Sequence, residues 1–171
     1  MSGDERNLMH CKNCGAPLAL VGGRNYFYCE YCRSYFFPAA SSDEVVVLDG
    51  PLDDVRCPAC KAYLARASVD GHNGWHCQNC HGFLLDQSSF ANIAKVRRAL
   101  AQGPSEQPPP LNREELKRSL TCPSCQKALD AHPYYGPGNV VVDTCARCHL
   151  IWLDHGKLRR IIRAPGRDRG D

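Results

Sequence analysis

The sequence contains no hydrophobic run long enough to cross a membrane. Its most apolar stretches, such as residues 45–48, span a few positions, whereas a membrane-spanning helix needs about 20. The first ten residues, MSGDERNLMH, also lack the apolar core of a secretory signal. We therefore expect a cytoplasmic protein without membrane contacts, in a compartment where thiols remain reduced.

Motifs of several common enzyme sites are missing as well. The sequence has no P-loop, no glycine-rich dinucleotide motif and no nucleophile elbow. A redox CxxC pair would be expected at the start of a helix in a thioredoxin-like unit, a context that this sequence does not provide. We therefore expect no catalytic residues and no small-molecule substrate.

No cysteine stands alone in this chain. All twelve fall in CxxC pairs, at positions 11/14, 29/32, 57/60, 77/80, 122/125 and 145/148. Such pairing is typical of a disulfide framework in an exported protein or of metal sites in a reducing compartment. Without a secretory signal, the second interpretation is favoured, and zinc is the expected metal.

The spacing between pairs predicts how they combine. Fourteen, sixteen and nineteen residues separate the two pairs of the first, second and third sets. Two CxxC knuckles joined by a hairpin of that length can place four thiolates around one tetrahedral ion, and pairing neighbours closes the shortest loops. An interleaved, cross-braced arrangement remains the alternative. The predicted ligands of three structural Zn²⁺ ions are Cys11, Cys14, Cys29 and Cys32; Cys57, Cys60, Cys77 and Cys80; and Cys122, Cys125, Cys145 and Cys148. Histidines next to knuckle cysteines, such as His76, His81 and His149, are not expected to bind zinc, because four sulfurs complete each site.

Other residues repeat together with the cysteines. A leucine follows each first knuckle at the same distance, at positions 18, 64 and 129. An apolar triplet follows each second knuckle, at residues 35–37, 83–85 and 151–153. Short apolar segments before the second knuckle predict strands, and glycines between the knuckles predict hairpin turns. The predicted fold is a small, metal-stabilised α+β structure of three tandem zinc ribbons built from short antiparallel β-hairpins.

Helices are expected after the second and third ribbons. Asp86 and Asp154 directly follow the apolar triplets and are suitable N-caps. Apolar residues that recur with helical spacing then predict one buried face on each helix: Phe90, Ile93, Val96 and Leu100 on the first, and Leu158, Ile161 and Ile162 on the second. In the first ribbon Pro38 takes the place of the aspartate, and no helical pattern follows.

The repeats divide the chain into four segments. These are ribbon 1 (1–50), ribbon 2 with its helix (51–102), a Pro-rich linker with a short helix (103–119), and ribbon 3 with a basic C-terminal helix (120–171). Asn112 and Glu115 predict a capping box at the start of the short helix. A ribbon of this size cannot fold on hydrophobic burial alone, and bound zinc contributes roughly 10–16 kcal/mol of apparent binding energy. We expect ribbons 1 and 2 to form an N-terminal pair and the linker to separate ribbon 3 from them.

Residues 122–158 resemble the bacterial zinc-ribbon family named after the ribbon of transcription factor IIB. The resemblance lies in the CPSC knuckle, the second knuckle, the Trp152-Leu153-Asp154 turn and the helix that follows. The second unit is similar but has Leu84 in place of the tryptophan, and the first unit keeps only the cysteines and the apolar triplet. This chain also has Ser89 and Lys157 where the family usually has a glutamate. The resemblance implies zinc binding, and it implies transcription only through the family's name.

Basic residues concentrate in the two expected helices. The formal charge is +3, from 21 basic and 18 acidic side chains. Twelve thiolates and three Zn²⁺ ions would lower it to about −3, so the overall charge does not predict nucleic-acid binding. Locally, a basic helix can contact phosphates, whereas a solvated helix face is the simpler interpretation. The candidate contact residues are Lys95, Arg98, Lys157, Arg159, Arg160 and Arg163.

These features favour a non-enzymatic zinc-ribbon protein that acts as a protein-interaction adaptor of regulatory character. A link to transcription rests on the family name alone. The alternative function is that of a DNA- or RNA-binding factor that uses the basic C-terminal helix. We thus expect a protein partner, with nucleic acid as the other possibility.

Overall fold

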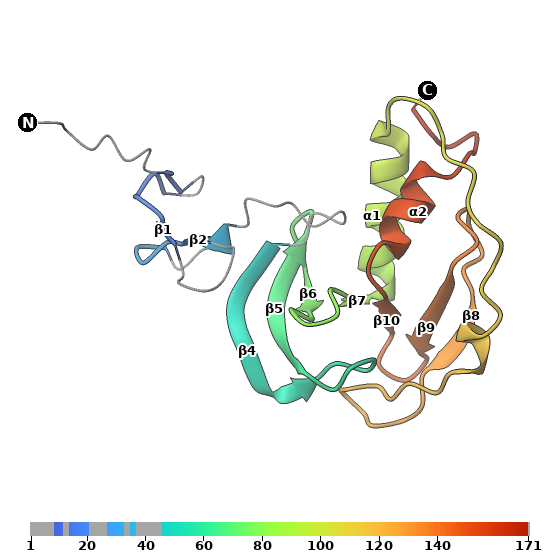
Figure 1. Cartoon of the computed structure of the whole chain (residues 1–171), viewed down its shortest axis with the longest axis horizontal. Coiled ribbons are helices and arrows are strands. Elements are labelled where there is room, and N and C mark those ends of the chain that lie inside the picture. The colour runs from blue at the N-terminus through green and yellow to red at the C-terminus, as the bar shows by residue number, and fades with distance from the viewer. Residues whose placement is uncertain (1–8, 12–13, 21–26, 33–34, 37–45, 171) are drawn as a thin grey trace, which may run out of the picture.

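The computed structural model describes residues 9–11, 14–20, 27–32, 35–36 and 46–170. In these residues the chain forms two antiparallel sheets and two α-helices (Figure 1). The smaller sheet has three strands, in the order β1 (Ala19–Leu20), β2 (Phe27–Tyr28) and β3 (Tyr35–Phe36). It belongs to the first cysteine set, and its core contains Cys11, Leu18 and Cys29. Phe37, the last residue of the first apolar triplet, and Pro38, which stands in the place of the aspartate, lie outside the described residues.

The larger sheet joins the second and third ribbons. Its strand order is β4 (Val46–Arg56), β5 (Tyr63–Val69), β6 (His72–His76), β7 (Phe83–Asp86), β10 (Leu150–Leu153), β9 (Val141–Cys145) and β8 (Asp130–Pro133). Strands β5 to β7 belong to ribbon 2 and strands β8 to β10 to ribbon 3. The two ribbons therefore meet in the middle of one sheet, at the pairing of β7 with β10.

The junction is built from two copies of the repeated apolar triplet. Leu84 lies opposite Trp152, Phe83 opposite Leu153, and Leu85 opposite Ile151. The middle residues of the two triplets occupy equivalent positions in their ribbons, and they lie opposite each other in the pairing. This register gives ribbons 2 and 3 an approximate internal twofold relation of the kind found in isologous dimers.

This arrangement differs from the expected separation of ribbon 3 by the linker. The triplets are apolar at every position, so both faces of β7 and β10 must be covered, and each strand also needs a hydrogen-bonded neighbour. Pairing β7 with β10 supplies the hydrogen-bonded neighbour and places both strands between the helices on one face and the cysteines on the other. Ribbons 2 and 3 consequently share a core, while the described residues of the first ribbon have a separate one.

Different groups pack on the two faces of the larger sheet. One face is covered by α1 (Gln87–Leu100) and α2 (Lys157–Arg163), which lie side by side in Figure 1. The core on this face includes Phe83, Leu85, Ile151 and Leu153 from the sheet, Phe90 and Ile93 from α1, and Leu158 and Ile161 from α2. The opposite face holds Leu84 and Trp152 together with Leu64, Leu129 and cysteines of both sets. Because side chains alternate along a strand, the outer residues of each triplet lie on the face that the helices cover and the middle residues lie on the face with the cysteines.

The two predicted helix caps have different outcomes. Asp86 caps α1 as expected, since its carboxylate accepts hydrogen bonds from the amides of Ser88 (3.0 Å) and Ser89 (3.2 Å). The prediction for Asp154 is wrong, because α2 begins after Gly156, whose φ of 82° only glycine adopts readily. Asp154 instead accepts a hydrogen bond from the indole nitrogen of Trp152 at 3.1 Å.

The predicted helix faces are confirmed in part. Leu158 and Ile161 are fully buried, and Ile162 packs against the same core. On α1, Phe90 and Ile93 are buried, but Val96 and Leu100 are exposed. Ala94 and Arg98 take their places because the face that residues 90, 94 and 98 share lies over the sheet and against the end of α2.

The segment between α1 and ribbon 3 is attached along its length and is not a free spacer. The amide of Glu106 donates to the carbonyl of Arg163 (2.8 Å), and the side chain of Asn139 donates to the carbonyl of Pro109 (3.3 Å). The predicted short helix is a single 3-10 turn, η1 (Glu115–Lys117), before which the Asn112 side chain accepts from the Glu114 amide at 3.1 Å. These contacts hold the segment against the third ribbon.

Neither α1 nor α2 has the length and hydrophobicity that a bilayer-spanning helix requires, and the same holds for the rest of the described chain.

The ribbon junction predicts a measurable clash at Gly82. A Cβ atom added there would lie 2.3 Å from Cζ2 of Trp152, so we expect Gly82→Ala to lower the free energy of unfolding by about 1–3 kcal/mol. Denaturant unfolding of the zinc-loaded protein measures this. Trp152→Leu introduces the residue found at the equivalent position 84 and removes the indole that the added Cβ atom would meet. In this background Gly82→Ala should lower the free energy of unfolding by clearly less. Equal costs in both backgrounds would contradict the described junction.

Candidate metal centres

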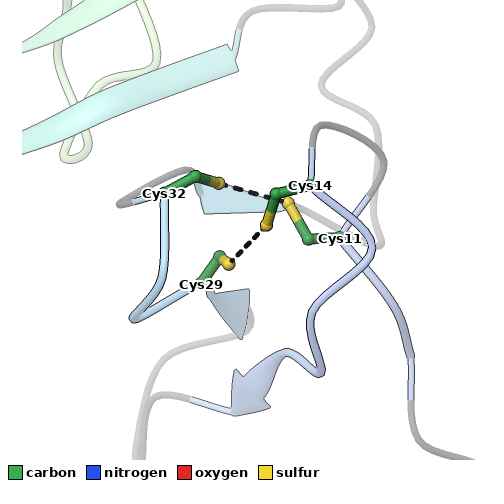
Figure 2. Close-up of side chains that lie close together, drawn as sticks. All are labelled: Cys11, Cys14, Cys29 and Cys32. Atoms are coloured by element: carbon green, nitrogen blue, oxygen red, sulfur yellow. Dashed lines mark hydrogen bonds between the residues drawn. The ribbon is translucent and has the colours of Figure 1, made fainter.

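The structure places the twelve cysteines in three groups of four. The sulfurs of each group all lie within 4.8 Å of one another, and the groups are Cys11, Cys14, Cys29 and Cys32; Cys57, Cys60, Cys77 and Cys80; and Cys122, Cys125, Cys145 and Cys148. Figure 2 shows the first group, with the two knuckles facing each other. The prediction of three neighbour-paired sites is therefore confirmed, and the interleaved alternative is wrong.

The sulfur distances suit a single zinc ion in each group. Across the knuckles, the Sγ atoms of Cys11 and Cys32 are 3.5 Å apart, and those of Cys60 and Cys77 are 3.4 Å apart. In the third group Cys125 and Cys145 are separated by 3.6 Å. Four sulfurs at about 2.3 Å from one tetrahedral ion would be about 3.8 Å apart, whereas a disulfide requires about 2 Å. The donor set therefore fits three structural Zn²⁺ ions, and all twelve cysteines are free thiols.

Each knuckle has the same backbone turn wherever it is described. The residue after its second cysteine has a left-handed conformation, at Gly15 (φ 76°), Lys61 (65°), His81 (61°), Gln126 (61°) and His149 (56°). This conformation turns the backbone so that the amide of that residue donates to the carbonyl of the first cysteine, as from His81 to Cys77 at 2.8 Å. The residue after Cys32 lies outside the described chain.

Backbone amides also point at the sulfurs. The amides of Cys60 and Cys80 lie 3.4 Å from the Sγ atoms of Cys57 and Cys77, and the amide of Cys148 lies 3.3 Å from that of Cys145. Such bonds stabilise a thiolate and orient it toward the ion. In the second and third groups the knuckle backbone thus helps to orient the sulfurs toward one ion.

The thiols of the third group differ in how readily they lose a proton. Burial raises the pKa of Cys122 to about 12. The pKa of Cys125 is lowered to about 7, chiefly because the Lys127 amide donates a hydrogen bond to its sulfur. Because zinc binds thiolates, filling the site must release the proton of Cys122, and acid should favour release of the ion.

Two of the six predicted contact residues are buried. Arg98 is 2% exposed, and its guanidinium donates to the carbonyls of Ile161 (2.5 Å) and Ala164 (2.9 Å) at the end of α2. Lys157 is 3% exposed, and its ammonium group donates to the Val141 carbonyl (2.6 Å) and pairs with Glu115 (2.6 Å). Arg98 and Lys157 therefore hold the fold together and are removed from the candidate contact surface.

Three of the other candidates are exposed, and Arg160 is partly buried. Arg160 donates to the carbonyl of Asn139 at 2.9 Å, and Arg163 pairs with Glu106 at 2.7 Å. Lys95 and Arg159 are exposed on α1 and α2. The six residues therefore do not form the single basic face that the sequence suggested.

A buried ion network escaped the sequence analysis. Asp143, which is fully buried in β9, is paired with Arg118, and Arg118 also pairs with Asp154 at 2.7 Å. Desolvation raises the pKa of Asp143, and the hydrogen bond from Arg118 opposes that rise. The signal in the sequence was a single charged residue in the apolar strand VVVDTC, which requires a partner when buried.

Comparison with known proteins matches the third metal group. Residues 121–164 match the family of transcription factor zinc-fingers, which includes the zinc ribbon of the TFIIB type. The predicted resemblance is thus confirmed for ribbon 3, whereas the weaker resemblance of ribbon 2 stays a prediction.

One curated relative is similar to part of the chain. The human metastasis-associated protein MTA2 is 33% identical to this chain over 63 residues. The match covers 36% of this chain and 9% of MTA2. No solved structure matches the chain.

The geometry predicts three zinc ions per chain in freshly purified, reduced protein. Elemental analysis that gives two or fewer would remove one of the four-sulfur assignments. A chelator should extract the first ion fastest, because Cys14 and Cys32 are exposed whereas the second cysteines of the other knuckles are partly buried. Mass spectrometry of the native protein during chelation, followed by mapping of the freed thiols, measures the order of loss.

The shared sheet predicts that the second and third groups depend on each other. Cys145→Ser should release the third ion and disorder β9 and β10, so that β7 loses one of its two neighbouring strands and the amide chemical shifts of residues 83–100 change as well. Cys29→Ser, the equivalent change in the first ribbon, should leave residues 54–170 unaffected. If Cys145→Ser alters only ribbon 3, the two ribbons fold independently and this account of the core is wrong.

Proposed function

We propose that the protein is a non-enzymatic adaptor that uses three zinc ribbons to bind other proteins in a regulatory assembly. The observation that carries this proposal is that each ion would have four sulfur ligands held by prearranged knuckles. Such a coordination sphere is complete, so the zinc would serve the fold and present no open position to a substrate. The binding surface would then be the ribbons themselves.

The larger sheet supplies a rigid scaffold for such a surface. In the described chain β4 and β8 lie at its two ends, and an edge strand can accept a partner's strand or loop. Beyond β8, the hairpin tip carries Tyr135, which is 93% exposed and stacks against His132. An exposed aromatic ring on a rigid hairpin is a suitable anchor for a protein partner.

Nucleic-acid binding is the second candidate function, and the placement of the basic residues supports it less. At least four of the six candidate cations donate to groups of the described chain: Arg98, Lys157, Arg160 and Arg163. Phosphate contacts would have to replace those bonds or depend on few residues. The name of the matching family favours a role linked to transcription, which either function could serve.

The adaptor function is tested by affinity capture of the zinc-loaded protein from its own cells, with and without nuclease. We expect the same proteins to be retained after nuclease treatment and to bind directly when purified. The matched control is Tyr135→Ser, which removes the exposed ring while leaving the metal groups intact. Loss of every partner after nuclease would favour the nucleic-acid function.

A salt series gives the complementary measurement. We expect binding to duplex DNA and to RNA no tighter than about millimolar near physiological salt, because most of the candidate cations already donate to groups of the described chain. The change of Arg159, Arg160 and Arg163 together to Gln should then alter little. If the wild type instead binds tightly, with a log-log salt slope of about −3 to −4 that the triple variant flattens, the adaptor proposal is contradicted.

A further inference from the structure

Three histidines gather where ribbons 2 and 3 meet. His76 ends β6, His81 follows the knuckle of Cys77 and Cys80, and His155 precedes α2. The ring centroids of His76 and His81 are 6.0 Å apart, and those of His81 and His155 are 5.6 Å apart. Two of these side chains come from ribbon 2 and one from ribbon 3.

His76 is the unusual member of this group. It is only 6% exposed, and neither of its ring nitrogens has a hydrogen-bond partner among the residues that the structure describes. Buried polar groups in folded proteins are nearly always paired, so such a side chain points to a ligand that pairs with it. His81 and His155, in contrast, are exposed and can approach such a ligand from the solvent side.

We propose that His76, His81 and His155 form a fourth metal site, for a divalent transition-metal ion bound by imidazole nitrogens. Imidazole is a preferred ligand of Zn²⁺, Ni²⁺ and Cu²⁺. Three histidines leave one position of a tetrahedral ion to water or to a group of a partner, in contrast to the closed four-sulfur sites. The ion would also tie the two ribbons together, because its ligands come from both.

The spacing of two of the three ring pairs is close to what a shared ion requires. Two imidazoles on one tetrahedral ion, with metal–nitrogen distances of about 2.0–2.1 Å, have centroids about 5 Å apart. The observed separations of 5.6 and 6.0 Å exceed this by less than about 1 Å. Rotation of the exposed rings of His81 and His155 toward the buried His76 can close that gap.

The other side of the junction provides an internal comparison. The positions equivalent to His76, His81 and His155 under the twofold relation are Thr144, His149 and Gln87. Gln87 fills its place with hydrogen bonds from its side-chain amide to the carbonyls of Cys145 (3.4 Å) and Leu150 (3.3 Å). Only one of these three equivalent positions is a histidine, and Thr144, in the place of His76, is hydrogen-bonded to His132 at 3.1 Å, so that side should not bind an ion.

The experiment uses the intact protein with its three zinc ions and adds Zn²⁺ as the probe. Zinc is chosen because exchange with the four-sulfur sites then changes nothing. Calorimetry, together with NMR of the imidazole groups, should show a fourth ion that shifts the signals of His76, His81 and His155. His81→Asn and His155→Gln should each weaken this binding by about tenfold or more, since one of three ligands is lost.

The substitutions are chosen to keep the fold. Asn tolerates the left-handed backbone at position 81, and Gln is the residue found at the equivalent position 87. His149→Asn is the matched control and should leave the fourth ion in place, and three zinc ions in each variant verify that the ribbons are intact. The proposal is overturned if no fourth ion binds, if its binding survives both His81→Asn and His155→Gln, or if His149→Asn weakens it equally.

Discussion

The pairing of β7 with β10 is the interaction on which most of this structure depends. It places Leu84 opposite Trp152 and turns two small ribbons into one seven-stranded sheet. A ribbon alone has too little apolar surface to fold stably, and the pairing gives both ribbons a common core under α1 and α2. Buried cations then fasten this core, with Arg98 of α1 bound to the end of α2 and Lys157 of α2 bound to β9.

The metal groups and the sheet support each other from opposite sides. The knuckles that begin at Cys57, Cys77 and Cys145 lie at the ends of β4, β6 and β9, and cysteines of the second and third groups pack with Leu84 and Trp152 on the face away from the helices. Ions bound there would fix the strand ends, and the helices cover the other face. Because the four-sulfur groups would serve only to hold the fold, a partner must be recognised by the surfaces between them. Those surfaces are the strand edges, the hairpin tip at Tyr135 and the histidines at the ribbon junction.

Much of this could be predicted from the sequence, and what could not has a physical reason. The pairing of neighbouring CxxC knuckles could be predicted because closing a short loop costs less entropy than closing a long one. The cap at Asp86 could be predicted because it depends on residues adjacent in the chain. The joining of ribbons 2 and 3 depends on strands separated by the whole linker, which local patterns do not report. One signal was present, since the triplet of Ile151, Trp152 and Leu153 is apolar on both faces, as central strands are.

The basic residues show the opposite limit. Arg98 and Arg97 are neighbours with similar side chains, yet Arg98 is buried against α2 while Arg97 pairs with Asp70 at the surface. The helical period decides which of them faces the core, and the exposed Val96 and Leu100 show that apolar spacing alone did not identify that face. A basic cluster in a sequence therefore predicts a contact surface only once the basic side chains that bond within the fold have been set aside.

The central claim is that ribbons 2 and 3 form one sheet through β7 and β10. It is tested most directly by nuclear Overhauser effects between backbone protons in the zinc-loaded protein. The account predicts cross-strand effects that link Leu84 with Trp152, and Phe83 with Leu153, together with a single rotational correlation time for residues 54–170. The absence of every cross-strand effect between residues 83–86 and 150–153, with separate correlation times for the two ribbons, would contradict it.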